Sequence, residues 1–241
     1  MHAQRPGASF SGSHVTAPVG SPVDDRSAPR PVHCILEGKY GRLRPIEPAR
    51  DAERLYRLSH GETRQALWAY LSSGPFATPS DFEGHVSSIA ASTTDTVYWA
   101  IADATDAAVG WLSLMRIEPR HRVIEVGNIL YTPLLQRTRL ATEAQFLIAR
   151  HVFEDLGYRR FEWKCNDLNA PSRRAAVRFG FSYEGRFRQH MIIKGRNRDT
   201  AWYAMLDHEW PECKANYERW LAPGNFDENG RQRTKLNPIL S

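Results

Sequence analysis

The middle of the chain carries short runs rich in apolar, β-branched and aromatic residues, a pattern typical of β-strands. Three such runs follow one another at residues 96–101, 108–115 and 122–131, and the short polar connections between them favour antiparallel hairpins. The spacing then changes, because apolar residues between 144 and 156 recur with a helical period until Gly157 ends the helix.

Further helical and strand-like runs lie on both sides of these strands. The runs before them are a strand at 41–47 and helices at 51–58, with Asp51 as the expected cap, 62–71 and 79–91. The runs after them are a strand at 159–165, a helix between Asn169 and Gly180, and strands at 181–190 and 198–206. This order predicts an α/β fold with a mixed sheet rather than a doubly wound one.

The two ends of the chain differ from its middle. Thirteen of residues 1–32 are Ser, Pro or Gly, and apolar residues show no period there, which predicts a flexible N-terminal tail. We expect one folded domain at residues 33–221 and a polar C-terminal extension at 222–241. Three aromatic residues between 210 and 220 have helix-compatible spacing, and we expect them to pack on the body or on a partner subunit in a homodimer.

The composition narrows the range of functions. The 241 residues are 41% hydrophobic and 24% charged, and no apolar run is long enough for a membrane-spanning helix. The N-terminus has no apolar core like that of a signal peptide, so we expect a cytoplasmic protein. The three cysteines lack disulfide or metal-ligand spacing. The net charge of +5 suits an anionic cofactor or substrate, but it is too small to indicate nucleic-acid binding by itself.

The junction between the third strand and the helix after it carries the strongest chemical signal. A helix N-terminus leaves several backbone N–H groups unpaired, and these donors together with the helix dipole suit a pyrophosphate. Arg137 and Arg139 add two positive charges at the same place. The pattern also fits an ordinary strand–helix turn with solvated arginines, and the local sequence leaves both interpretations open.

Two blocks of sequence resemble the GNAT superfamily of N-acetyltransferases. Residues 136–141 (Gln-Arg-Thr-Arg-Leu-Ala) are similar to the Q/R-x-x-G-x-G/A pyrophosphate loop, and residues 141–144 resemble its continuation in the RimJ/RimL-like branch. Residues 169–172 (Asn-Ala-Pro-Ser), followed by Gly-Phe at 180–181, are similar to the N-x-x-S and G-F blocks of that branch. Arg139 takes the place of the first glycine of the loop, and we expect a charge-assisted hydrogen bond there instead of a backbone contact.

The resemblance implies a mixed, mostly antiparallel sheet flanked by helices, with two splayed strands that form the acyl-CoA cleft. It also implies acetyl-CoA as co-substrate, and the reaction needs no metal. Backbone groups at the strand end would hold the acyl chain and polarise the thioester, and the loop would hold the pyrophosphate. The cofactor-binding residues implied in this way are Ile129, Leu130, Tyr131, Gln136, Arg137, Thr138, Arg139, Leu140, Ala141, Thr142, Asn169 and Ser172.

Two residues are candidates for proton transfer. Glu125 lies on the strand that leads into the loop, where related histone acetyltransferases carry their general base, so the resemblance makes it the candidate base, acting through water. The alternative for Glu125 is a strand residue on the solvent face. Many family members use a tyrosine as acid four residues before the G-F glycine, but that position is Ala176 here. Ser172 is therefore the candidate proton donor to the thiolate, or else a hydrogen-bonding residue of the first helical turn.

The acceptor side has weaker candidates. Trp68 and Tyr70 come from the region that forms the acceptor wall in this superfamily, so they are candidate substrate-binding residues, with a place in the core as the alternative. Arg173 or Arg174 is a candidate for contact with a coenzyme A phosphate. We expect Cys165 to be a buried structural residue.

We therefore expect an N-acetyltransferase that moves an acetyl group from acetyl-CoA to a primary amine by direct attack in a ternary complex. A protein N-terminus and a small-molecule amine both fit as acceptor, and neither a membrane nor a nucleic acid is expected as a partner. Arg139 and Ala176 motivate an alternative, a non-catalytic protein that binds or senses acyl-CoA.

Overall fold

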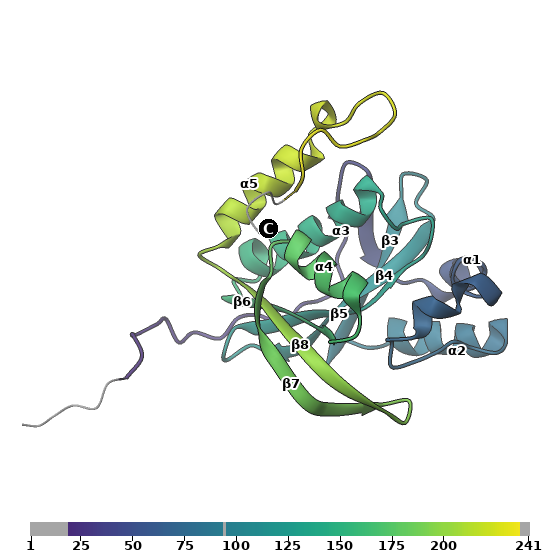
Figure 1. Cartoon of the computed structure of the whole chain (residues 1–241), viewed down its shortest axis with the longest axis horizontal. Coiled ribbons are helices and arrows are strands. Elements are labelled where there is room, and N and C mark those ends of the chain that lie inside the picture. Colours follow the sequence, from purple (N-terminus) through teal and green to yellow (C-terminus); the bar gives the residue numbers. More distant parts are fainter. Residues whose placement is uncertain (1–18, 94, 237–241) are drawn as a thin grey trace, which may run out of the picture.

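A computed structural model describes residues 19–93 and 95–236, and its centre is a sheet of eight strands (Figure 1). The strands lie in the order β1-β2-β3-β4-β5-β6-β8-β7, and every neighbouring pair is antiparallel except β5 and β6, which are parallel. The predicted mixed, mostly antiparallel sheet is confirmed. The strands are β1 Leu36–Glu37, β2 Gly41–Pro45, β3 Thr96–Asp103, β4 Ala108–Glu118, β5 Val123–Tyr131, β6 Arg160–Asn166, β7 Ser182–Ile193 and β8 Arg196–Leu206.

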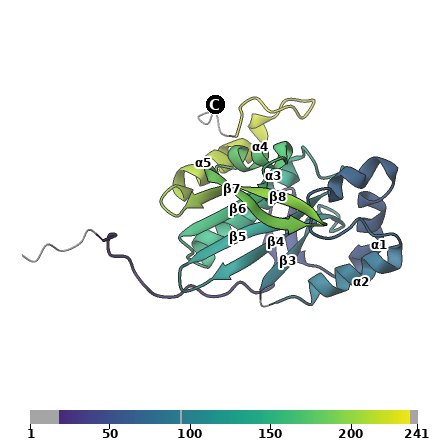
Figure 2. The ribbon, with the colours of Figure 1, turned by 60° about the horizontal axis from the view of Figure 1, so that its bottom comes forward.

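Helices cover both faces of the sheet (Figure 2). α3, α4 and α5 pack on one face against the larger core, which includes Trp99 and Leu112. α1 and α2 pack on the other face, against Ala100 and Trp111. Neighbouring strand residues therefore reach opposite cores, as the period of two requires. The helices are α1 Pro48–Ser59, η1 Glu62–Trp68, α2 Pro79–Ala90, α3 Arg139–Arg150 with its π-helical continuation η2 His151–Asp155, α4 Ala170–Arg178, α5 Trp210–Leu221 and η3 Pro223–Asn225.

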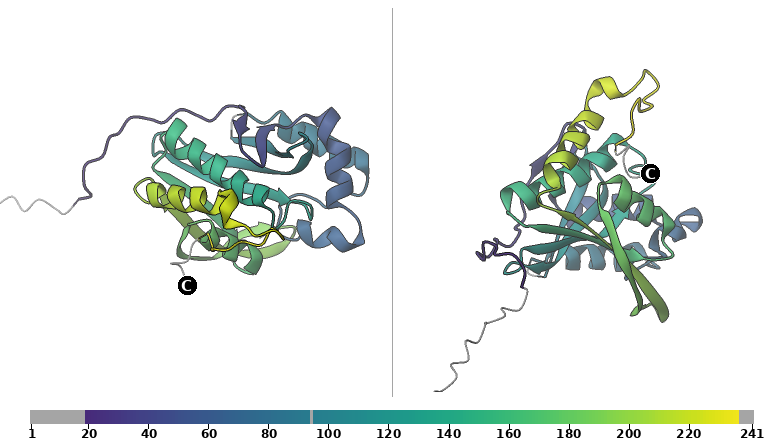
Figure 3. Two further views of the ribbon diagram at one scale, coloured as in Figure 1. Left: turned by 90° about the horizontal axis from the view of Figure 1, so that it is seen from above. Right: turned by 60° about the vertical axis from the view of Figure 1, so that its left-hand side comes forward.

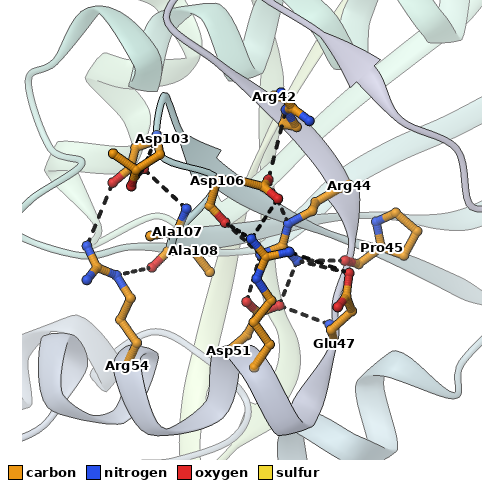
Figure 4. Close-up of polar contacts among 12 residues, drawn as sticks. Arg42, Arg44, Pro45, Glu47, Asp51, Arg54, Asp103, Asp106, Ala107 and Ala108 are labelled. Carbon is orange, nitrogen blue, oxygen red and sulfur yellow. Dashed lines mark hydrogen bonds and ion pairs between the residues drawn. The ribbon is translucent and has the colours of Figure 1, made fainter.

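The first helix begins earlier than its pattern predicts. α1 starts at Pro48, so the prediction of Asp51 as its cap is wrong. The Asp51 carboxylate instead accepts a hydrogen bond from the Glu47 amide (2.9 Å) and two bonds of 2.8 Å from Arg44 on β2 (Figure 4). Asp106, in the β3–β4 turn, lies 3.2 Å from the same guanidinium. A buried arginine on a neighbouring strand thus takes the carboxylate that the local pattern assigns to capping, and it fixes α1 to the sheet.

Four other elements differ from the prediction. Residues 62–68 form a 3-10 helix rather than an α-helix, and the short strand β1 is not predicted at all. β7 and β8 continue further than predicted, to a two-residue turn at Lys194 and Gly195. Both turn residues have positive φ values, 49° and 70°, as the tightest hairpin turns require.

Both terminal segments contact the domain where the structure describes them. The Ala28 amide donates to a carbonyl in the β4–β5 turn (3.0 Å), and the Pro29 carbonyl accepts from the Tyr158 hydroxyl (3.1 Å). In the C-terminal extension, the Asn225 side chain bonds the backbone on both sides of its loop, and Leu236 is buried. The first eighteen residues of the predicted tail and the last five of the extension lie outside the described residues. No helix of the described chain combines the length and the apolar character that crossing a membrane requires.

Candidate functional site

β5 and β6 lie side by side where they begin and then separate. Their parallel pairing runs from Val123 opposite Arg160 to Val126 opposite Trp163, and within the described chain it goes no further. From Gly127 onward β5 pairs only with β4, while the end of β6 pairs only with β8. This is the separation of neighbouring strands that the sequence resemblance implies.

Asn128 explains why β5 leaves its neighbour. Its φ of 49° lies in the left-handed region, at a register shift between β4 and β5. Its carbonyl accepts a hydrogen bond from the Trp111 indole (2.8 Å), and its side-chain amide donates to the Tyr98 hydroxyl (2.9 Å). The polar groups of Asn128 are therefore committed to β3 and β4. Burial raises the pKa of Tyr98 to about 12, so its hydroxyl stays protonated at neutral pH.

The N-terminus of α3 presents free backbone donors beside this separation. Thr138 caps the helix, because its hydroxyl accepts a hydrogen bond from the Ala141 amide (3.1 Å). The amides of Arg137, Arg139 and Leu140 find no acceptor among the residues that the structure describes. Three free N–H groups at a helix N-terminus match the donor set that a pyrophosphate needs.

The side chain of Arg139 packs on two aromatic rings. The guanidinium carbon lies 3.9 Å from the centre of the Phe226 ring and 5.5 Å from that of Tyr40. Phe226 belongs to the C-terminal extension, so this contact joins the extension to the first turn of α3. A charge-assisted bond from Arg139 to a phosphate stays a prediction, while its amide remains among the free donors.

Several of the predicted binding residues have buried side chains. The Tyr131 hydroxyl donates to the Ala141 carbonyl (2.9 Å) and accepts from Gln145 (3.0 Å), and burial raises the pKa of this tyrosine. The Thr142 hydroxyl accepts from Arg178 of α4 (3.1 Å). Leu130, Leu140 and Ala141 are also buried. Leu130, Leu140, Ala141 and Thr142 therefore face a ligand through their backbone, Tyr131 is partly buried, and Arg137 and Gln136 have exposed side chains.

Ser172 lies in the first turn of α4, which Asn169 caps by accepting the Ser172 amide (3.2 Å). The Ser172 oxygen accepts a hydrogen bond from the Trp163 indole (3.0 Å). An indole N–H can only donate, so the hydroxyl proton of Ser172 is left to be donated. Burial raises the pKa of the Cys165 thiol, and a hydrogen bond with Ser172 opposes that shift. Position 176, where many family members carry the acid, is a fully buried alanine and has no proton to donate.

Glu125 stands on β5 just before the strands part, and it is 4% exposed rather than on a solvent face. Its Oε2 atom lies 3.0 Å from Arg116 Nε and 3.1 Å from Lys164 Nζ, as ion pairs without hydrogen-bond angles. Burial raises the pKa of the Glu125 carboxyl, although Lys164 and Arg116 act in the opposite direction. The site thus holds a buried carboxylate with a raised proton affinity.

Sequence reasoning missed the cations around Glu125. Lys164, itself 5% exposed, lies between Glu125 and Glu162 (2.6 Å), with its ammonium 3.9 Å from the Trp202 ring centre. Alternation within β6 is the signal that could have placed Lys164 and Glu162 on the face opposite Trp163. The sequence gives no comparable signal for Arg116, because its partner depends on the register between β4 and β5.

The two candidate acceptor residues have different surroundings. Trp68 is 1% exposed and packs in the smaller core, and its indole donates a hydrogen bond to the Ser59 carbonyl (2.8 Å). Tyr70 is 38% exposed, and its hydroxyl donates to the Leu168 carbonyl (3.1 Å) in the loop before α4. Tyr70, which follows the 3-10 helix η1, is therefore bonded to the loop that leads to Ser172.

The remaining sequence candidates have structural partners or lie in solvent. Arg173 contacts Asp167 (3.2 Å) and the Tyr203 hydroxyl (3.3 Å), Arg174 is exposed, and Cys165 is buried. The described part of the chain contains no group of three or more His, Cys, Asp or Glu side chains that could hold a metal ion.

Comparisons with known proteins agree with this geometry. Residues 42–182 match the acetyltransferase (GNAT) domain. The crystal structure of a GCN5-related N-acetyltransferase from Brucella melitensis is 46% identical, with a TM-score of 0.85 over 88% of this chain and 96% of that one. The ribosomal-protein-serine acetyltransferase of Escherichia coli (strain K12) is 30% identical over 101 residues, 42% of this chain and 56% of that protein. Mycobacterium smegmatis RimJ, solved in complex with CoA-disulfide, shares the fold at 19% identity, with a TM-score of 0.64 over 80% of this chain and 93% of that one.

The matched region includes both strands that separate, the N-terminus of α3, Glu125 and Ser172. The family uses acetyl-CoA, and the free amides of α3 beside the parted strands fit the pyrophosphate of that coenzyme. More than half of the chain lies inside the family match. The chain therefore belongs to the GNAT family of acetyltransferases and is an acyltransferase enzyme.

Proposed function

We propose that this acyltransferase moves an acetyl group from acetyl-CoA to a primary amine by direct attack of the amine in a ternary complex. The observation that carries the proposal is the position of two proton-transfer groups on opposite faces of the separating strands. Glu125 lies on the face opposite α3, while Ser172 lies on the face of α3 and α4, bonded to Trp163 of β6.

Glu125 is suited to remove a proton from the acceptor. Both ion pairs involve Oε2, so Oε1 is the atom that can accept a proton, through water, from an ammonium group. Burial raises the proton affinity of the carboxyl, while Lys164 and Arg116 favour its ionised form. A carboxylate whose proton affinity is raised by burial is a stronger base than an exposed glutamate, and it can pass the proton on to solvent afterwards.

Ser172 is suited to supply a proton to the leaving group. The amine nitrogen forms a bond to the thioester carbonyl carbon and loses its second proton to solvent, the carbon–sulfur bond breaks, and the sulfur receives the hydroxyl proton of Ser172. The serine regains a proton from solvent. Because an ordinary thiol has a pKa of about 8.5, a thiolate leaves readily and a weak donor is sufficient.

Acetyl-CoA, when it is bound, supplies the acetyl group in activated form as a thioester. In our proposal the amides of Arg137, Arg139 and Leu140 hold the pyrophosphate, and the exposed side chain of Arg137 adds charge to them. Backbone groups of residues 129–131, on the part of β5 that has left β6, hold the acyl arm and polarise the thioester carbonyl.

The acceptor that we propose is a protein N-terminus, with a small-molecule amine as the second class. The name of the Escherichia coli relative, a ribosomal-protein-serine acetyltransferase, supports the first class. Tyr70 supports it as well, because its partly exposed ring lies between the acceptor-side helices and the loop before α4.

The test compares Glu125→Gln and Ser172→Ala with the wild-type enzyme in turnover and in calorimetric titration with acetyl-CoA. A general base contributes about 100-fold or more, so kcat of Glu125→Gln should fall by that factor. The smaller demand on the acid predicts a loss of about tenfold in Ser172→Ala. Affinity for acetyl-CoA should stay within about twofold in both variants, since neither side chain holds the pyrophosphate.

Two exposed residues of α2 provide matched controls. Glu83→Gln and Ser87→Ala make the same chemical changes away from the strands, and their kcat should equal that of the wild type. An unchanged kcat in Glu125→Gln or Ser172→Ala would remove that residue from the mechanism. A wild-type enzyme that binds acetyl-CoA but acetylates no amine would favour a binding or sensing protein.

A further inference from the structure

An acceptor must approach Glu125 on the face of the sheet opposite α3. α1 and α2 pack there against β3 and β4. The hairpin of β7 and β8 projects from the body of the domain (Figure 3). Its tip is tied to the acceptor side, because the Lys194 ammonium donates to the Trp68 carbonyl (2.8 Å). The hairpin and the helical segment at Trp68 therefore meet beside this face.

The hairpin carries an excess of positive charge. Its acidic residues are already occupied: Glu184 pairs with Arg160, and Asp199 accepts from the Gln189 amide and from Asn197. The cations that form no ion pair with any described residue are Arg188, Lys194, Arg196 and Arg198. A surface of this kind attracts an acidic partner and repels a cationic one.

Arg198 is the member of this group that belongs to the site. It is partly buried, and of its guanidinium nitrogens only Nε has an acceptor in the described chain, the Thr200 hydroxyl (3.1 Å). Alternate residues of β8 share a face of the sheet, so Arg198 lies on the same face as Trp202, whose ring contacts Lys164. Burial lowers the pKa of the Arg198 guanidinium, and the negative charge of Glu125 acts in the opposite direction.

We propose that the natural acceptor is an acidic peptide, whose N-terminal amine lies at Glu125 and whose next few residues place a carboxylate on Arg198. The inference rests on the proposed function and adds the class of substrate to it. An extended peptide advances about 3.3–3.6 Å per residue, so a carboxylate in the second or third position comes within reach of a neighbouring strand. A guanidinium with free Nη atoms binds a carboxylate at two points.

An acidic acceptor also solves an electrostatic problem of the site. Arg198 is partly buried and forms no ion pair with any described residue, so it adds positive charge on this face of the sheet and disfavours the arrival of an ammonium group. A carboxylate carried by the acceptor neutralises Arg198 while the amine reaches Glu125. The other three cations of the hairpin then attract acidic residues further along the peptide.

The experiment uses pairs of peptides of equal length with the same N-terminal serine. One series continues with Glu and Asp, and the other has Gln and Asn at the same positions. kcat/KM and the anisotropy of labelled peptides bound to the CoA-loaded enzyme are measured for both. A carboxylate on a guanidinium predicts at least a tenfold preference for the acidic series in both quantities, and the preference should fall as salt is added.

Variants of Arg198 test the assignment of that preference. Arg198→Gln should bring the ratio between the two series close to one, and Arg198→Lys should keep part of it, because the charge remains without the two-point contact. Arg174→Gln removes an exposed arginine of α4, away from the hairpin, and should leave the ratio unchanged. Unfolding temperatures show whether each variant is folded.

Equal kcat/KM and equal binding of both series by the wild type would overturn the inference and leave the proposed function intact. Tight binding of an RNA oligonucleotide together with equal peptide binding would assign the hairpin to nucleic acid, and it would overturn the inference too. If acetyl-CoA binds but no peptide or small amine is acetylated, the proposed function fails, and the anisotropy of the two series still decides the inference.

Discussion

Arg139→Gly restores the glycine that the pyrophosphate loop of the family has at this position. In the structure the Arg139 guanidinium lies on Phe226 of the C-terminal extension, while only the amide of residue 139 joins the free donors of α3. A glycine keeps that amide. We therefore expect Arg139→Gly to leave the affinity for acetyl-CoA within about threefold, and to weaken the attachment of the C-terminal extension instead.

The expected loss of stability follows from the contacts. A cation–π pair at 3.9 Å that is partly shielded from solvent is worth about 1–2 kcal/mol. Glycine in the first helical turn costs up to about 1 kcal/mol relative to other residues. Removing a positive charge from a helix N-terminus returns about 0.3–1 kcal/mol. The sum is a destabilisation of roughly 1–2 kcal/mol, or a fall in Tm of about 3–8 °C for a chain of this length.

The assay is a double-mutant cycle of Arg139→Gly and Phe226→Leu, with unfolding in urea and calorimetric titration of acetyl-CoA. The leucine keeps apolar bulk but removes the aromatic face, so the two changes should couple by at least about 0.5 kcal/mol. Additive changes in the free energy of unfolding would refute the contact. A tenfold loss of coenzyme affinity in Arg139→Gly would show that the guanidinium binds phosphate, as the sequence comparison predicts.

Other predictions concern single side chains. Asp51→Ala removes two of the hydrogen bonds to the buried Arg44 guanidinium and leaves it the Asp106 carboxylate at 3.2 Å, so urea unfolding should show a loss of about 1–3 kcal/mol, and no measurable loss would contradict the buried pair. Burial raises the pKa of Cys213 from 9.0 to about 11. Its thiolate forms only as the pH rises toward that value, so iodoacetamide labelling at pH 8 should be about 100-fold slower than in unfolded protein, and equal rates would argue against the burial. In Gly127→Ala the new Cβ would lie 3.5 Å from Glu125 Oε1 and close to the flexible Met115 side chain, so kcat should fall several-fold with Tm changed by only a few degrees; a wild-type kcat would place the reacting atoms elsewhere.

Seven of the eight strands could be predicted from the chain because apolar runs and turn residues are local signals. The three central runs correspond to β3, β4 and β5, and the helix after them begins at a threonine cap that its sequence pattern allows. Even Glu125 and Ser172 could be proposed as a pair, since Ser172 lies in a block that resembles the family and Glu125 lies on the strand that leads into the other block. What these predictions share is dependence on neighbours within a few positions of the chain.

The partners of those residues could not be predicted in the same way. Arg116 and Lys164 pair with Glu125 from β4 and β6, and Arg198 lies further along the sheet on β8, so only the register of the strands brings these cations to one region. The sequence pattern predicts Asp51 as a helix cap because its actual partner, Arg44, lies on another element of the chain. The stacking of Arg139 on Phe226 joins positions 87 residues apart, and no local pattern encodes it.

The measurement that tests the account most directly is thermal unfolding with and without acetyl-CoA, with NAD as the control ligand. At a hundredfold excess over its dissociation constant, a ligand that binds only the native state adds about 2.7 kcal/mol of stability. For a chain of this length the account predicts a rise in Tm of about 5–10 °C with acetyl-CoA and none with NAD. No rise at millimolar acetyl-CoA would mean that the free amides of α3 do not hold the coenzyme, and the proposed acetyl transfer would be contradicted.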